Sequence, residues 1–350
     1  MLFSFDFPDT IQYNNRQGEY MQVTIYDIAK MANVSASTVS RVVNNKENVN
    51  SKTRAKILKL LAEHNYVPNE AARGLVMQSS HMIGILITDI RTTQHTDGIY
   101  YIERELAEHG YSCLIHNTGR DESKWISYIQ LLSQRKIEAL ILMGSIYQSD
   151  VVKEALRLYL PSIPVIICNG YLQAPNVYGL VADELNGVAD CVALLKEKGR
   201  AHPAFLMNQT TPSNEQKREG YEAGMARYYP QLPLIELESG NDFADIRDAT
   251  VQMLKQHPNI DSIIYSEDRL AAVGLRTLAD MGKRVPEDIA VIGINNSDYA
   301  KLSIPTLTSL DNMLYDVSIT AARNILTLLS GQRVSRKMLI CTEIVERQST

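Results

Sequence analysis

Residues 23–44 read VTIYDIAKMANVSASTVSRVVN, a pattern typical of two short helices around a tight turn. Thr24 precedes apolar residues at helical spacing, and the carboxylate of Asp27 stands where it can accept a hydrogen bond from the backbone of the cap. Asn33 tolerates the left-handed conformation that ends a helix, and Ser35 can cap a second helix with Val39 on its apolar face. The pattern predicts two capped helices joined by only a few residues.

A short-linked pair of this kind matches the helix-turn-helix, whose second helix enters the major groove of DNA. Arg41 on that helix could make a bidentate contact with guanine, worth roughly 1–3 kcal/mol of discrimination. In the alternative reading, common for isolated helix pairs, the hydroxyls are only caps and Arg41 is a solvated charge. The side chains expected to face bases are Ala36, Ser37 and Arg41, and those expected to donate to phosphates are Thr24, Ser35, Thr38 and Asn44.

The residues that follow strengthen the DNA-binding interpretation. Asn50 is expected to cap a third helix over residues 51–64, with Ile57 among its inward residues, so that three helices share one core over residues 21–68. Eight basic residues stand against four acidic ones between Met21 and Ser79, although the whole chain has a formal net charge of −5. Positive charge is thus concentrated in the segment that would touch phosphate. Pro68 ends this domain, and residues 69–80 form a weak, Gly-containing hinge.

Beyond Met82 the pattern changes to short apolar strands alternating with amphipathic helices. Two successive series of strand-then-helix units predict an α/β core with two lobes of parallel sheet, each covered on both faces. Ligands bind such sheets beyond the carboxyl ends of the strands, although any one polar residue there could be an ordinary loop residue. The candidates for binding a ligand by this rule are Asp89, Arg91, Thr92, Ser145, Asn169, Asp268 and Asn295.

Several strings together carry a family resemblance. They are residues 23–44, residues 65–75, Ile83-Gly84-Ile85, SEDRLAAVG at 266–274, PEDIAVIGINN at 286–296 and PTLTSL at 305–310. From about Val23 to its end the chain resembles the lactose-repressor (LacI/GalR) family of bacterial transcription regulators. The resemblance implies a homodimeric repressor of double-stranded operator DNA, with a helix-turn-helix domain, a hinge helix and a two-lobed periplasmic-binding-protein-like core.

The resemblance also implies details of the hinge and the lobes. Asn50, Asn69, Ala72 and Leu75 would join the DNA contacts, with Leu75 wedged into a minor-groove step; otherwise Leu75 is a packing residue in a linker. The chain would cross between the lobes three times. Lobe 1 is expected over about residues 81–182 and 313–338, and lobe 2 over about 183–312 and 339–350.

The expected controlling ligand is a small molecule, with a sugar as the first choice. Lys217 stands where relatives usually have arginine, and Asn295 where aspartate is common, so the site should be polar and less charged than usual. Phe243 is either a stacking ring or a core residue. A phosphorylated protein partner, as in the catabolite-control branch, remains an alternative because of Lys217 and Arg323. A solute-binding protein is a further alternative that the DNA-reading segment disfavours.

Composition and motifs argue against other classes. The 350-residue chain has four separated cysteines, no paired cysteine ligands, and no G-x-S-x-G, Walker or H-E-x-x-H motif, so we expect neither an enzyme nor a metal or cofactor site. Residues 1–20 lack the features of an export signal and are expected to be a disordered extension. No apolar run approaches the length of a membrane helix. These features predict a cytoplasmic protein with free thiols.

Overall fold

The computed structural model describes residues 23–43, 47–66 and 80–350. The chain divides into two compact units, residues 1–79 and 80–350, and each is considered by itself. The predicted hinge, apart from Ser80, and the N-terminal extension lie outside the described residues.

The described residues of the first unit form three helices: α1 (Ile25–Ala32), α2 (Ala36–Val43) and α3 (Ser51–Glu63). Ile28, Val39 and Ile57, one from each helix, are fully buried and form the centre of a small core. The predicted capping box of Thr24 and Asp27 is present, Asn33 ends α1 in the left-handed conformation, and Asn50 caps α3. The predicted helix-turn-helix is therefore confirmed as a fold.

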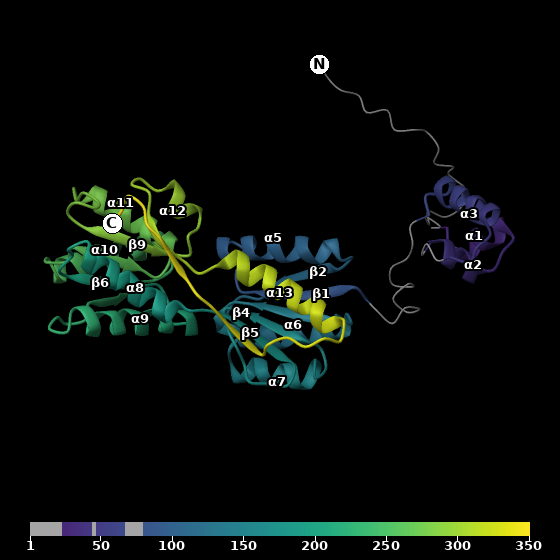
Figure 1. Ribbon diagram of the computed structural model, residues 1–350, viewed down its shortest axis with the longest axis horizontal. Coiled ribbons are helices and arrows are strands. Elements are labelled where there is room, and N and C mark those ends of the chain that lie inside the picture. The colour runs from purple at the N-terminus through teal and green to yellow at the C-terminus, as the bar shows by residue number, and fades with distance from the viewer. Residues whose placement is uncertain (1–22, 44–46, 67–79) are drawn as a thin grey trace, which may run out of the picture. The chain divides into compact units, whose positions relative to one another are not determined.

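Lobe 1 of the second unit is a six-stranded parallel sheet in the order β11-β5-β4-β3-β1-β2. Its strands are β1 (Met82–Ile87), β2 (Ser112–Asn117), β3 (Ala139–Met143), β4 (Val165–Cys168), β5 (Val177–Ala182) and β11 (Lys337–Ile340). Helices α5 (Thr93–Glu108) and α13 (Leu314–Leu329) cover one face, while α6 (Glu122–Gln134) and α7 (Asp150–Tyr159) cover the other (Figure 1). A short 3₁₀ turn, η1 (Ser145–Tyr147), follows β3.

Lobe 2 repeats this architecture with the strand order β12-β10-β9-β8-β6-β7. Its strands are β6 (Pro203–Met207), β7 (Glu236–Glu238), β8 (Ser262–Tyr265), β9 (Ala290–Ile294), β10 (Thr308–Asp311) and the antiparallel β12 (Glu343–Val345). Helices α8 (Glu184–Glu197) and α9 (Pro212–Tyr228) pack on one face, and α10 (Phe243–Gln256) and α11 (Asp268–Asp280) on the other. A short helix, α12 (Asp298–Leu302), follows β9.

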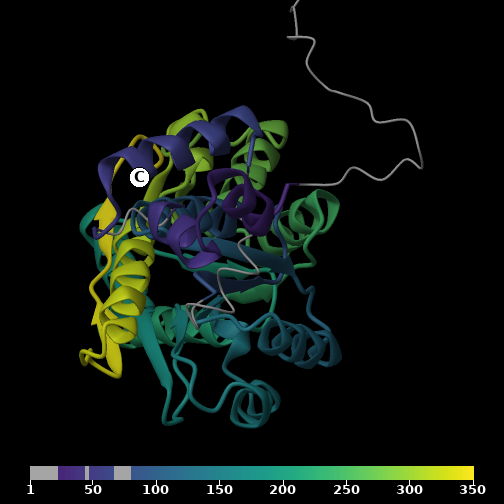
Figure 2. The same ribbon diagram turned by 90° about the vertical axis from the view of Figure 1, so that its right-hand side faces the viewer.

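Three chain segments connect the lobes, after β5, after β10 and after β11. The third is the yellow extended segment in Figure 1, and Figure 2 shows helix α13, also yellow, from the side. Leu339 and Ile340 still pair with β5 in lobe 1, so this crossing follows Ile340, close to the boundary expected at about residue 338. The predicted α/β fold with two lobes of mainly parallel sheet is confirmed. Among the described residues, no helix is long and apolar enough to cross a membrane.

Candidate functional site

The start of α1 is held by side-chain bonds that already use the polar groups of Thr24. Its hydroxyl donates to Asp27 Oδ2 at 2.6 Å and accepts from the backbone N–H of Asp27 at 3.3 Å. Hydrogen bonds from Thr24 hold the pKa of the Asp27 carboxyl below its usual range. If this hydroxyl is to donate to a phosphate, it must first give up its bond to Asp27.

Helix α2 presents an exposed polar face that suits groove contacts. Ser37 and Arg41 are exposed and lie four residues apart, so they share one face of the helix. Ser35 caps the helix through the N–H of Thr38, and its Oγ lies 2.8 Å from the hydroxyl oxygens of both Ser37 and Thr38. Ala36 is half-buried and packs against the three-helix core, which leaves less of its methyl group for a base.

Two features of this unit are additional to the predicted contacts. Tyr26 on α1 is 73% exposed, a large ring in solvent that breaks the apolar spacing of its helix. Lys56 Nζ donates to the carbonyl of Ala32 at 2.9 Å and so ties α3 to the end of α1.

Asn50 Oδ1 accepts from the N–H of Lys52 at 3.0 Å, which makes it a cap. The predicted contacts Asn44, Asn69, Ala72 and Leu75 lie outside the described residues.

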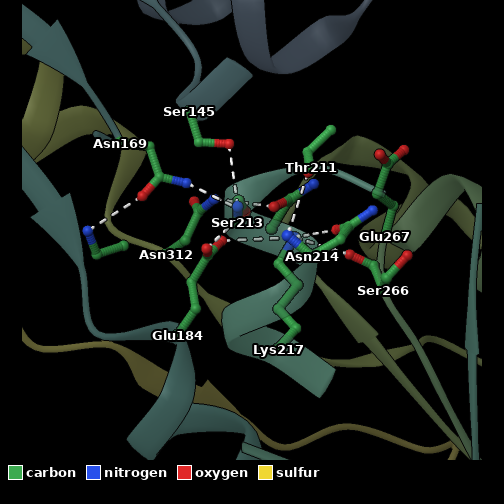
Figure 3. A network of polar contacts seen from close by, with 12 residues as sticks. Ser145, Asn169, Glu184, Thr211, Ser213, Asn214, Lys217, Ser266, Glu267 and Asn312 are labelled. Carbon is green, nitrogen blue, oxygen red and sulfur yellow. Dashed lines mark hydrogen bonds and ion pairs between the residues drawn. The ribbon is translucent and has the colours of Figure 1, made fainter. Parts of the chain in front are cut away.

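Where the two lobes meet, a polar network centres on Ser213 at the start of α9 (Figure 3). Its backbone N–H donates to Ser145 Oγ at 3.0 Å, and its hydroxyl accepts from Asn169 Nδ2 at 3.3 Å. The same hydroxyl donates to Glu184 Oε2 at 2.5 Å. Ser145 and Asn169 follow strands of lobe 1, so the network joins two predicted ligand residues to lobe 2.

Lys217 lies one turn further along α9 and is only 4% exposed. Its ammonium group is 3.4 Å from Glu184 Oε1, and Glu184 is fully buried. It also donates to Asn214 Oδ1 at 3.3 Å and to the carbonyl of Ser266 at 3.1 Å. The predicted ligand-binding cation is thus engaged by the protein's own oxygens.

Sequence reasoning missed Glu184, Ser213, Asn214 and Asn312 (Figure 3). Glu184 and Asn312 follow β5 and β10, at the first two crossings between lobes. The rule that selects polar residues after strands would have found both, had it been applied to strands that end at a crossing. Ser213 and Asn214 gave no comparable signal, because they begin a helix after a loop.

The residues after β1 form a separate cluster. Arg91 is exposed and pairs with Asp89 at 2.6 Å, and this guanidinium lowers the pKa of Asp89 to about 2. Thr92 is half-buried at the start of α5. His95 Nδ1 lies 2.9 Å from the carbonyl oxygen of Asp89, and burial lowers the pKa of the ring. Arg91 therefore points to solvent, while His95 lies close enough to Glu267 of lobe 2 to feel its charge.

Asp268 does not present a free carboxylate to a ligand. It is 1% exposed, and its Oδ2 accepts from the N–H of Ser297 at 2.7 Å and from its hydroxyl at 2.8 Å. Its Oδ1 accepts from Ser309 Oγ at 2.6 Å. Burial raises the pKa of this carboxyl to about 6 despite these bonds. The oxygens of Asp268 thus anchor the loop after β9, and its contact with a ligand stays a prediction.

That loop places Asn295 where the lobes meet. Asn295 has a φ of 112°, and its side-chain oxygen accepts from Asn312 Nδ2 at 2.8 Å. Its carbonyl accepts from Gln94 of lobe 1 at 3.3 Å. Asn295 therefore lies in the same inter-lobe region as Asn312 and remains a candidate.

Phe243, at the start of α10, is exposed, and the Arg269 guanidinium lies 5.8 Å from its ring centre. The alternative that Phe243 is a core residue is therefore wrong, because its ring is outside the core clusters.

Two of the hollows on this unit lie away from the Ser213 network. One of about 430 Å³ is at the far ends of α8 and α9, lined by residues including Arg200 and Tyr228. The other, of about 280 Å³, lies between Thr93 of α5 and Tyr299 of α12. The network is the stronger candidate because its polar groups converge from both lobes. Within the described ranges, no group of three His, Cys, Asp or Glu side chains could hold a metal ion.

Comparisons with known proteins agree with this division. Residues 24–69 match the family model described as bacterial regulatory proteins, lacI family, and residues 192–350 match a periplasmic binding protein-like domain. An HTH-type transcriptional regulator of Lachnoclostridium phytofermentans is 32% identical over 94% of this chain and 99% of its own length. The ribose operon repressor of Halalkalibacterium halodurans is 28% identical over 93% of this chain and 97% of its own.

A solved structure gives the same result in three dimensions. The lac repressor dimer bound to operator and the anti-inducer ONPF is 25% identical, with a TM-score of 0.85 over 93% of this chain and 98% of that one. The similarity extends over both units of the chain.

Proposed function

Because this chain belongs to the lacI family of bacterial regulatory proteins, we propose that it represses transcription and that a sugar bound between its lobes controls its affinity for the operator. The chain is a DNA-binding transcriptional regulator and not an enzyme. A regulator of this kind acts in the cytoplasm, the compartment we propose for it.

The observation that carries the DNA-reading proposal is the exposed face of α2. Arg41 and Ser37 project from a capped helix whose opposite face is locked into the core by Val39 and Val42. An exposed arginine on the second helix of a helix-turn-helix can reach guanine O6 and N7. Thr24, Ser35, Thr38 and Asn50 are proposed to contact the backbone, which fixes register without reading sequence.

The test compares two basic residues. Operators selected from a randomised DNA pool would be titrated with the wild type, Arg41→Ala and Lys52→Ala at several salt concentrations. Arg41→Ala should lose roughly 1–3 kcal/mol of preference for the selected site over random DNA. Lys52→Ala should weaken binding to all DNA alike and reduce the salt dependence. Unchanged preference in Arg41→Ala would refute its role as base reader.

The effector proposal is supported by the polar network that joins the lobes at Ser213, Asn169 and Ser145. A ligand that binds one arrangement of the lobes better than the other changes operator affinity by that difference, and we propose that it weakens DNA binding. One relative is named a ribose operon repressor, which makes a sugar a reasonable class.

Melting of the full chain with a panel of sugars tests this part, since a ligand that binds only the folded state raises the melting temperature. A sugar that raises it should also release the selected operator. No shift with any sugar would instead favour a protein partner. Arg323, on which that alternative partly rests, is exposed and pairs with Glu105 at 2.8 Å.

A further inference from the structure

The Glu184–Lys217 pair bears on the chemical class of the effector. Resting on the effector site of the proposed function, we propose that this site selects a polyhydroxylated ligand without negative charge, a neutral or amine-bearing sugar, and discriminates against sugar acids and sugar phosphates.

The first observation is that the buried cation is already neutralised. Lys217 Nζ faces three oxygen acceptors, one each from Glu184, Asn214 and Ser266, and an ammonium group has three hydrogens to donate. A ligand carboxylate or phosphate would have to displace Glu184 and leave that carboxylate buried without its partner, which is costly.

The second observation concerns the start of α9. The first N–H groups of a helix are ordinarily a ready anion site. Here the N–H of Ser213 donates to Ser145 Oγ, that of Asn214 donates to Thr211 Oγ1, and that of Glu215 donates to the Thr211 carbonyl. These donors are used within the protein, so the helix start has little to offer an anion.

The third observation is that the polar atoms with room for a further hydrogen bond are acceptors. Within the described part of the chain, no hydrogen bond reaches the buried Asn312 Oδ1. The half-buried Glu267 carboxylate lies near the same network, with Asn208 Nδ2 at 3.5 Å (Figure 3). Oxygens with spare capacity are satisfied by hydroxyl or ammonium donors, and they repel anions.

The experiment uses matched ligands on the full-length protein. Each sugar, for example glucose, galactose and ribose, is compared with its amino, acid and phosphate derivatives at constant ionic strength, by saturable melting shift and operator release. The neutral or amino form should bind about tenfold or more tightly than the anionic form of the same sugar. An anionic form that binds more tightly than its neutral counterpart overturns the proposal.

Two variants locate the effect. Glu184→Gln removes the negative charge that is paired with Lys217, so the affinity for the anionic form of the sugar should rise about tenfold or more. Glu215→Gln is the matched control, because it removes an acid of the same helix that pairs at the surface with Arg218, and it should behave as the wild type. Unchanged anion affinity in folded Glu184→Gln contradicts the proposal.

Inorganic phosphate separates this inference from the sugar proposal. If no sugar binds, the proposal of a sugar effector is wrong. Saturable phosphate binding that Glu184→Gln gains and the wild type lacks would still support the inference that Glu184 excludes anions. No phosphate binding by Glu184→Gln would refute that inference. If Glu184→Gln does not fold, the wild type decides. If the wild type binds phosphate saturably and Lys217→Gln does not, the proposal is overturned. If the wild type does not bind phosphate, the proposal is supported.

Discussion

At the scale of single residues, burial decides which polar groups remain free for a ligand. Asp268 and Lys217 both occupy positions where ligand contacts were expected, yet each is enclosed by acceptors or donors of the protein. Asp268 accepts hydrogen bonds from Ser297 and Ser309, and Lys217 forms an ion pair with Glu184. Their polarity is evident from the sequence, but their partners come from elements 29 to 41 positions away for Asp268.

Asp268 should make stability depend on pH in an unusual direction. Its folded pKa of about 6 exceeds the ordinary aspartate value of 3.8, so the folded state binds this proton more tightly than the unfolded state. The contribution of Asp268 to the free energy of unfolding therefore increases as pH falls from 7 to 4, by on the order of 3 kcal/mol, and is lost as pH rises through 6.

Urea unfolding between pH 4 and 7 would measure this, with Asp268→Asn lacking the dependence that the wild type shows. Asp280→Asn, which changes an exposed carboxylate at the other end of α11, should keep the wild-type dependence. Identical pH profiles for wild type and Asp268→Asn would exclude a raised pKa at this site.

At the scale of elements, helices α8 and α9 pack closely enough for residues of both helices to join the Ser213 network. Gly220 permits this approach, because a Cβ at that position would lie 2.3 Å from the carbonyl oxygen of Leu185. Glu184 at the start of α8 can then reach Ser213 and Lys217 on α9.

Gly220→Ala should therefore destabilise the protein. Helix propensity alone would favour alanine by about 1 kcal/mol, but the clash with backbone forces the helices apart and should reverse the sign, at a net cost of about 1–3 kcal/mol. Denaturant unfolding checks this, with Glu219→Ala on the exposed side of α9 as control. A more stable Gly220→Ala variant would show that the two helices can separate freely.

At the scale of the whole molecule, the exposed apolar side chains bear on the homodimer that the family resemblance implies. Leu302 ends α12, Ile304 follows two residues later, and both are exposed, Ile304 at 94%. Contiguous apolar side chains in solvent are typical of protein contact surfaces. We propose that a second copy of the chain covers them.

Ile304→Glu should shift the protein from dimer to monomer, because a carboxylate would be buried in the contact. Sedimentation over a range of concentrations measures this. Leu158→Glu, at an exposed apolar position on α7, is the control and should leave the dimer intact. A dimer that persists in Ile304→Glu would place the contact elsewhere.

Local signals in the sequence determined the helix-turn-helix, because its caps Thr24, Asn33 and Asn50 act within four residues of the groups they bind. Periodicity likewise determined the alternating strands and helices, since burial of one face imposes its spacing on the chain. Only the tertiary structure decided which polar residues meet where the lobes join. Glu184, Ser213 and Lys217 are brought together by the crossings and by the close packing of α8 and α9, and such contacts between distant segments leave no local pattern in the sequence.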